Sequence, residues 1–251
     1  MKNVEIIQLD LSDPNSIDQF SEKFLDSNRT LDILINNAGL MAIPLMRDKR
    51  GYEMQFATNH LGHFQLTSRL WEALKNARNS RVVTLSSAGH RFSGVDLDDP
   101  NFTMRPYDKW IAYGQSKTAN SLFSVELDRR GKKQNIRAFS VHPGRIPASN
   151  LVRYMTDDEL NNSGIYREDG VLKGPPGLKN IEQGAATTIW CAVSPQLINK
   201  GGVYCADCDI SEIIPDDSQL QSGVRRWAID KPTAKNLWEL SKRLTEIKWP
   251  V

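Results

Sequence analysis

Short apolar runs alternate along the chain with longer segments in which apolar residues recur at helical spacing. The apolar runs predict β-strands at 4–9, 31–35, 81–86, 136–141 and 202–204. The amphipathic segments predict helices at 14–26, 52–75, 107–130, 181–193 and 232–247. This alternation is typical of a parallel sheet covered by crossover helices. The sequence therefore predicts an α/β, doubly wound, Rossmann-type fold.

The chain has 251 residues, a length that suits one α/β domain, and no linker or internal repeat divides it. We therefore expect a single domain over 1–251. Within it, the stretch 144–180 carries so many glycines and prolines that no single regular element is expected there. We interpret this stretch as a mobile substrate lid.

Composition and charge exclude several classes of protein. The net charge is only +2, which argues against a nucleic-acid partner or an anionic membrane surface. The longest apolar runs span a few residues, so no transmembrane segment is expected, and the N-terminus does not resemble a signal peptide. Three cysteines suit a reducing compartment and predict a cytoplasmic location. No metal site is expected, because Cys205-Ala-Asp-Cys208 has no second pair to complete four ligands.

Tyr113 and Lys117 are four residues apart in a predicted helix, so their side chains project from the same face. A phenol has a reference pKa of about 10 and exchanges protons poorly at neutral pH. A neighbouring ammonium lowers that pKa, and the pair could then exchange a proton with a carbonyl or an alcohol. Taken alone, this spacing is common on solvated helix faces and carries little weight.

Other polar residues follow predicted strands. Ser87 comes directly after the strand at 81–86, and the run Asn36-Asn37-Ala38-Gly39 begins where the strand at 31–35 stops. Asn59 lies on the helix that comes next. Because the carboxyl ends of parallel strands form the ligand-binding edge of a doubly wound sheet, these positions predict a catalytic site.

Five motifs in order make the assignment specific: LDILINNAG at 31–39, FATNHLGHF at 56–64, RVVTLSSAG at 81–89, YGQSK at 113–117 and HPG at 142–144. The chain resembles the short-chain dehydrogenase/reductase family, and within it the branch of the retinol dehydrogenases and the WW-domain-containing oxidoreductase. The resemblance runs nearly end to end. It implies that Ser87 hydrogen-bonds the substrate oxygen and that Tyr113 transfers the proton. Lys117 would tune Tyr113 and hold the nicotinamide ribose, and Asn59 would anchor a relay water.

The resemblance also implies NAD or NADP as cofactor. Besides Tyr113 and Lys117, the residues expected to contact it are Asp10, Leu11, Asn37, Ala38, Gly39, Pro143, Gly144 and Ile146. One position departs from the family pattern. Ala148 stands where family members usually place a threonine, and Ser149 follows it, so the hydroxyl contact to the cofactor phosphate is missing or shifted by one residue.

A larger departure lies at the front of the chain. Family members begin with a strand, a glycine-rich turn that cradles the pyrophosphate, a helix and a second strand, whereas this sequence contains no such turn. We therefore expect a sheet that lacks its first two strands, and we interpret Met1 as an internal methionine of a longer reading frame. Either the strand at 4–9 moves to pair with 31–35, or the latter exposes an unpaired edge prone to association.

The resemblance thus implies an oxidoreductase that transfers a hydride between a nicotinamide cofactor and a small-molecule alcohol or carbonyl, with an apolar substrate if the retinol-dehydrogenase likeness extends to the pocket. The alternatives left open are a non-catalytic interaction protein and an inactive truncated gene product. A homo-oligomer is also an open expectation, because helices such as 52–75 pair subunits in many relatives.

Overall fold

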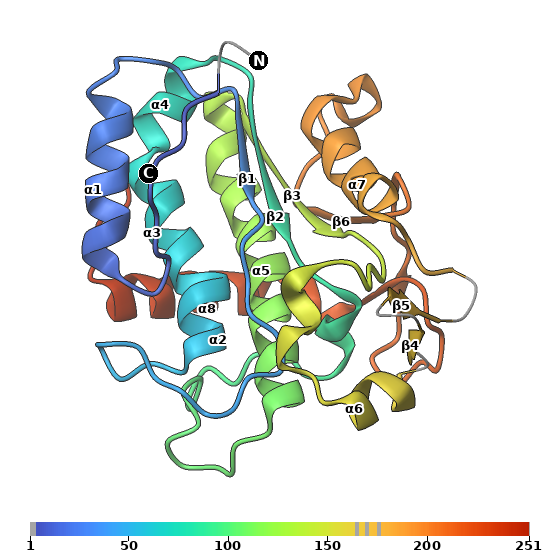
Figure 1. Ribbon diagram of the computed structural model, residues 1–251. Helices are drawn as coiled ribbons and strands as arrows, with labels where there is room; N and C mark the ends of the chain where they lie inside the picture. Colours follow the sequence, from blue (N-terminus) through green and yellow to red (C-terminus); the bar gives the residue numbers. More distant parts are fainter. Residues whose placement is uncertain (1–3, 164–165, 169–170, 175–176, 251) are drawn as a thin grey trace.

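The computed structural model describes residues 4–163, 166–168, 171–174 and 177–250. Its main sheet has five strands in the order β1-β2-β3-β6-β7, of which the first four run parallel and the last antiparallel (Figure 1). These strands are β1 (Ile33–Asn36), β2 (Ser80–Leu85), β3 (Ile136–His142), β6 (Val203–Ala206) and β7 (Asp209–Ile210). The predicted α/β doubly wound class is confirmed.

Helices cover both faces of this sheet. The described helices are α1 (Pro14–Leu25), α2 (Met54–Phe56), α3 (Gly62–Arg69), α4 (Trp71–Asn76), α5 (Lys109–Gly131), α6 (Asp157–Asn162), α7 (Ile181–Val193) and α8 (Lys231–Thr245), of which α6 lies apart from the sheet (Figure 1). Along β2, Val82 belongs to the apolar cluster on the α5 side and Val83 to the cluster on the α7 side. Because successive strand residues point to opposite faces, α5 and α7 lie on opposite sides of the sheet (Figure 1).

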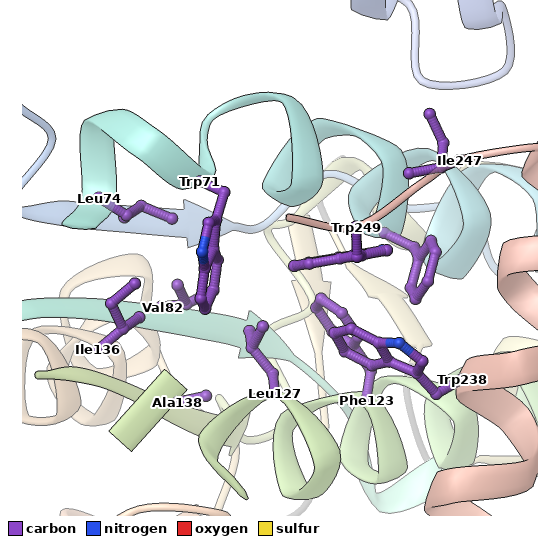
Figure 2. Packing of buried hydrophobic residues seen from close by; sticks show 11 residues of the cluster. Trp71, Leu74, Val82, Phe123, Leu127, Ile136, Ala138, Trp238, Ile247 and Trp249 are labelled. Carbon is purple, nitrogen blue, oxygen red and sulfur yellow. The ribbon is translucent and has the colours of Figure 1, made fainter. Parts of the chain in front are cut away.

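The core on the α5 side is rich in aromatic rings. Trp238 on α8 stacks on Phe123 on α5 with ring centroids 5.9 Å apart, and it also lies 4.3 Å from the ring of Trp249 (Figure 2). Trp71 on α4 meets Trp249 at 5.5 Å. Aromatic rings bury large apolar areas, so this cluster holds α4, α5, α8 and the C-terminal segment together.

The helices begin at side-chain caps that the sequence supplies. Asp13 accepts from the backbone N–H of Asn15, and Asp108 accepts from the first turn of α5. Asn180 and Gln183 form a capping box at the start of α7. Each cap satisfies amide groups that would otherwise lack partners, so α5 begins at a fixed residue one turn before Tyr113.

The strand ends are in register. Asn36 pairs with Thr84, and Leu85 pairs with Val141, so β1, β2 and β3 finish at the same edge of the sheet. The segments that follow them, residues 37–39, 86–87 and 143–144, therefore emerge side by side. This register creates the candidate site.

The predicted strand at 4–9 is wrong. These residues pair with no strand that the structure describes, and Val4 and Ile6 are 73% and 92% exposed. Within the part of the chain that the structure describes, β1 pairs only with β2, and Ile33 and Ile35 are 37% and 43% exposed. Of the two expected outcomes, the structure shows the unpaired edge. The apolar residues of the first segment are used differently, because Leu9 and Leu11 pack against α1 and α3.

Two predicted helices have different ends or interruptions. The one predicted at 52–75 is divided into α2, a π-helical turn (Ala57–Leu61), α3 and α4. The one predicted at 107–130 runs through Gly131, and the left-handed residue that follows is Asn135, with φ of 59°. Gly131 is therefore the last residue of the helix.

No single regular element was expected over the stretch 144–180, and the structure shows several short ones. They are a 3₁₀-helix (Asn150–Tyr154), α6, and an antiparallel pair of β4 (Tyr166–Glu168) with β5 (Val171–Lys173). Its two ends meet, because the N–H of Lys179 donates to the carbonyl of Arg145 at 2.8 Å. Residues 164–165, 169–170 and 175–176 of this stretch lie outside the described residues. Its role as a substrate lid stays a prediction.

The C-terminal part adds a parallel pair, β8 (Ile213–Ile214) with β9 (Val224–Arg225), which precedes α8. Between them and the sheet edge lies Tyr204 of β6, in a small apolar cluster with Val224 and Ala228. Among the described helices, none is both long and apolar enough to span a membrane.

Candidate active site

Ser87 and Tyr113 meet at the carboxyl edge of the sheet. Ser87 follows β2 and caps a one-turn 3₁₀-helix (Ala88–Arg91), with its Oγ accepting from the N–H of Gly89 at 3.0 Å. Tyr113 is buried in the second turn of α5. The Ser87 hydroxyl hydrogen-bonds with the Tyr113 phenol. Two side chains that are 26 positions apart in the sequence can therefore contact one substrate oxygen.

Lys117 lies one turn further along α5, where it is almost completely buried. Its Nζ donates to the carbonyl of Leu85 at 3.0 Å and lies 5.8 Å from the centroid of the Tyr113 ring. This hydrogen bond aims the ammonium at the end of β2. Its other two N–H groups have no acceptor among the protein groups that the structure describes, so they are free to hold ligand hydroxyls.

Burial sets the pKa of both groups. It raises the pKa of Tyr113 to about 12, although the hydrogen bond from Ser87 acts in the opposite direction. It also lowers the pKa of Lys117 to about 8. The sequence predicted that the ammonium would lower the phenol pKa, but Lys117 points to Leu85 and the loss of solvation prevails. Tyr113 is therefore a protonated phenol at neutral pH and is ready to donate.

Asn59 fixes the loop after β1 against α5. Its Oδ1 accepts from the N–H of Leu40 at 2.8 Å, and its Nδ2 donates to the carbonyl of Leu40 at 2.9 Å and to Oγ of Ser116 at 2.9 Å. The residue sits in the π-helical turn, a distortion found often at functional sites. Its own carbonyl contacts Nδ1 of His63 at 2.9 Å. The Asn59 side chain thus holds the loop of Gly39 beside the site.

Gly39 closes a tight corner between this loop and α5. A Cβ built on Gly39 would lie 3.1 Å from Oδ1 of Asn59 and 3.4 Å from Nζ of Lys117. Asn37 and Ala38 beside it are exposed. The corner therefore combines accessible backbone with an ammonium that has free donors. These features fit the ribose hydroxyls of a nicotinamide cofactor.

The third predicted cofactor segment follows β3. His142 Nδ1 accepts from the N–H of Ala88 at 3.2 Å, which ties this segment to the one after Ser87. Gly144 has a φ of +96°, a conformation that favours glycine. The Ile146 side chain packs on Gly184 of α7, where an added Cβ would be 2.1 Å from Cδ1. Pro143 and Gly144 therefore lie at the same edge as Ser87, whereas the Ile146 side chain is directed to α7.

Asp10 and Leu11 are not brought into contact with these groups by any interaction in the described structure. The Asp10 carboxylate accepts from the N–H and the hydroxyl of Ser12 at 2.9 and 2.7 Å. Leu11 is buried, and its carbonyl lies against Gly62 of α3, leaving no room for a Cβ there. Their contact with a cofactor stays a prediction.

Several residues beside the site carry roles that sequence reasoning either anticipated or missed. Ser86 donates to the carbonyl of Lys117 at 2.8 Å, so its hydroxyl joins the end of β2 to α5. Ser116 was missed, although it follows Tyr113 by three residues and bonds Asn59. Arg91 and Tyr204 were missed as well. Arg91 follows Ser87 by four residues and could have been noticed, whereas Tyr204 comes from β6 and carries no local signal.

Comparisons with known proteins agree with this geometry. A family model described as short chain dehydrogenase matches residues 1–160. A probable oxidoreductase of Streptomyces lividans is 41% identical over 232 residues, which cover 92% of this chain and 76% of that protein. Retinol dehydrogenase 12 of Mus musculus is 38% identical over 250 residues, 99% of this chain and 72% of that protein.

A crystal structure of an uncharacterised protein from Mycobacterium Paratuberculosis shares 32% identity and superposes with a TM-score of 0.70. The match covers 98% of this chain and 77% of that one. Sequence and fold therefore point to the same group that the motifs indicated. The chain with its Ser87, Tyr113 and Lys117 at one sheet edge belongs to the short-chain dehydrogenase family.

Proposed function

We propose that this protein uses NAD or NADP to interconvert an alcohol and a carbonyl compound, with Ser87, Tyr113, Lys117 and Asn59 as its site. The observation that carries the proposal is the hydrogen bond between Ser87 and the buried, protonated phenol of Tyr113. Lys117 supports it because the ammonium is held one turn away with donors to spare. This is the arrangement that proton transfer to a carbonyl oxygen requires.

In the reducing direction, Ser87 and Tyr113 hold the carbonyl oxygen by hydrogen bonds. When bound, the reduced nicotinamide supplies a hydride to the carbonyl carbon. The C=O π pair moves to oxygen, and Tyr113 gives its proton to that oxygen, so the product is a neutral alcohol. The phenolate that is left regains a proton from Lys117, and Lys117 in turn takes a proton from solvent. In the oxidising direction the phenolate takes the alcohol proton.

Support for an apolar substrate comes from two aromatic side chains. Phe92 follows the 3₁₀-helix that Ser87 begins, and its side chain is 52% exposed. Trp110 lies one turn before Tyr113. The rings of Phe92 and Trp110 make an edge-to-face contact with centroids 6.1 Å apart. They form an apolar lip beside the catalytic pair. Exposed aromatic surface next to a polar site is suited to the apolar body of a substrate.

The proposal extends to the cellular compartment and the assembly of the protein. The three cysteines are free, which supports a reducing compartment such as the cytoplasm. A homo-oligomer stays a proposal as well. The helix that was expected to pair subunits is largely covered, because residues 62–68 of α3 are all buried in the single chain.

The test measures nucleotide binding and turnover together. NADH or NADPH is titrated by its fluorescence, and reduction of 4-methylbenzaldehyde is followed by the loss of nicotinamide absorbance. Tyr113→Phe should lower kcat by a factor of about 10² or more without weakening nucleotide binding. Tyr52→Phe is the control, because the Tyr52 hydroxyl bonds the carbonyl of Leu244 outside the site. A chain that binds neither nucleotide would instead support a non-catalytic interaction protein or an inactive product.

A further inference from the structure

A second cluster of polar side chains lies beside the catalytic pair. It consists of Arg91 on the 3₁₀-helix that Ser87 begins, Tyr204 on β6 and Arg225 on β9. His90 joins them, because its ring lies 4.9 Å from that of Tyr204 and its Nε2 accepts from the N–H of Arg225 at 3.2 Å. We refer to Arg91, Tyr204 and Arg225 as the Arg91 corner.

The corner holds hydrogen-bond donors that lack acceptors. In the described structure, Nε of Arg91, Nε of Arg225 and the hydroxyl of Tyr204 are all buried without a partner. Arg225 is otherwise satisfied by the carbonyls of Pro215 and Ser218. Arg91 makes only a long contact of 3.4 Å from Nη2 to the carbonyl of Gly223. Buried donors without acceptors are costly, so Arg91 is the group here with the most to gain from a ligand.

The corner also has positive charge without a carboxylate of its own. Burial, together with the like-charged Arg225, lowers the pKa of Arg91, and among the described residues no carboxylate is found to act against them. The carboxylate of Asp207, which acts on the neighbouring His142, is held by Lys179 at 2.5 Å. Burial, with Arg91 and Lys179 nearby, lowers the pKa of His142 to about 4, so that imidazole is neutral. What the corner lacks is an anion.

The corner adjoins the reacting groups. Arg91 follows Ser87 by four residues, and His142 contacts the N–H of Ala88 between them. The Tyr204 phenol is close enough to Tyr113 for their charges to interact, and close enough to Arg91 for the guanidinium to favour its ionised form. These relations place the Arg91 corner next to Ser87 and Tyr113.

We propose that Arg91 binds a carboxylate carried by the substrate, so that the preferred substrates are carbonyl compounds with an apolar body and a carboxylate. The inference rests on the proposed function and names the substrate class of that same site. A guanidinium suits this ligand because it matches the carboxylate geometry with two parallel N–H groups. The carboxylate would also supply the acceptor that Nε of Arg91 lacks. The apolar lip of Phe92 and Trp110 would cover the rest of the molecule.

The experiment compares two aldehydes of similar size, 4-carboxybenzaldehyde and 4-methylbenzaldehyde, with the same reduced nucleotide. We expect kcat/KM to favour the carboxylate by about tenfold or more in the native chain. In Arg91→Gln this ratio should fall about tenfold, and in Arg91→Lys it should be partly kept. Arg226→Gln removes an exposed charge from the neighbouring segment and should leave the ratio within about twofold.

The outcomes separate the two proposals. If neither aldehyde is reduced, the proposed function fails. If 4-methylbenzaldehyde is reduced and the native chain shows no preference for the carboxylate, only the substrate class is wrong. A merely structural role of Arg91 would change both aldehydes equally and leave the ratio constant. A rise in the nucleotide Kd of Arg91→Gln with an unchanged ratio would place Arg91 on the cofactor and overturn the inference.

If Arg91→Gln does not fold, inhibition of the native chain still tests the inference. Benzoate should inhibit reduction of 4-methylbenzaldehyde competitively, and benzyl methyl ether of similar size should inhibit at least tenfold more weakly. Equal inhibition by the two compounds would overturn the inference. Inorganic phosphate is included as a third inhibitor. If phosphate is as effective as benzoate, the corner binds small anions in general and the assignment to a substrate carboxylate is wrong.

Discussion

Gly89 lies directly against the ring of Tyr113. A Cβ built on Gly89 would sit 2.6 Å from Cε1 and 2.9 Å from Cδ1 of that ring, and 3.4 Å from Oγ of Ser87. The glycine is not in the left-handed region, so its backbone does not require it. The absence of a side chain is needed for a different reason: it lets the phenol lie flush against the turn that presents Ser87.

Gly89→Ala should therefore push the Tyr113 ring away from Ser87. We expect kcat to fall at least tenfold, because small displacements of a catalytic group are costly, and stability to fall by about 1–3 kcal/mol from overpacking. Gly94→Ala is the matched control, since a Cβ there would meet only Cγ of Trp227 at 3.9 Å. Steady-state kinetics and urea unfolding of both variants provide the measurement. Equal kcat in both variants would show that the ring position does not matter.

Ser86 and Ser87 are adjacent, but substituting them should have different effects. Ser86→Ala should mainly lower stability, and Ser87→Ala should mainly lower activity. Ser86 is buried, donates to the carbonyl of Lys117 and accepts from the hydroxyl of Ser121 at 2.9 Å. Ser86→Ala removes these two hydrogen bonds and leaves the Ser121 hydroxyl its 3.3 Å contact with the carbonyl of Lys117, so we expect a loss of about 1 kcal/mol in unfolding free energy. Ser87→Ala should lower kcat about 10²-fold with less effect on unfolding. The reverse pattern would exchange the roles of the two serines.

The pKa of Lys117 predicts how stability depends on pH. Its pKa is about 8 in the folded chain and 10.5 in the unfolded chain. Between these values the unfolded chain binds more protons, so this group makes the unfolding free energy rise with pH. The Lys117→Met variant lacks this titrating group. The difference in unfolding free energy, native minus variant, should therefore increase by about 2 kcal/mol between pH 7.5 and pH 10. A difference that stays constant would mean that Lys117 is not desolvated as the structure shows.

The sequence predicted the strands and helices whose pattern is local. The segments around β2, β3 and α7 were found as expected because alternation and capping residues specify them. Residues 4–9 have strand-like apolar content but pair with no described strand, and Leu9 packs instead on α1 and α3 together with Leu11. Apolar periodicity also cannot show the π-helical turn, which adds one residue to a helix without changing its buried face much.

The candidate site was predictable where a motif places chemistry at the end of a strand, as for Ser87, or on one helix face, as for Tyr113 and Lys117. The pKa of Tyr113 was not predictable, since it depends on burial and on where the ammonium points. Nor was the Arg91 corner. It joins Arg91, which follows β2, to Tyr204 of β6 and Arg225 of β9, more than 100 positions further on, and only the folded chain brings them together.

An ion pair between described residues links the stretch 144–180 to α5, the helix that carries Tyr113. Glu159 of α6 lies 2.5 Å from Nζ of Lys109, four residues before Tyr113 in α5. Glu159→Gln keeps the capping box with Thr156, because glutamine serves equally at that position, but removes the charge. If this stretch is a lid, KM should rise about two- to fivefold at low salt, and the difference from the native chain should shrink near 0.5 M salt, where exposed pairs are screened. Glu72→Gln, which breaks the pair with Lys75 on α4, is the control and should leave KM unchanged. An identical KM for Glu159→Gln and the native chain at low salt would show that this ion pair does not hold a lid over the site.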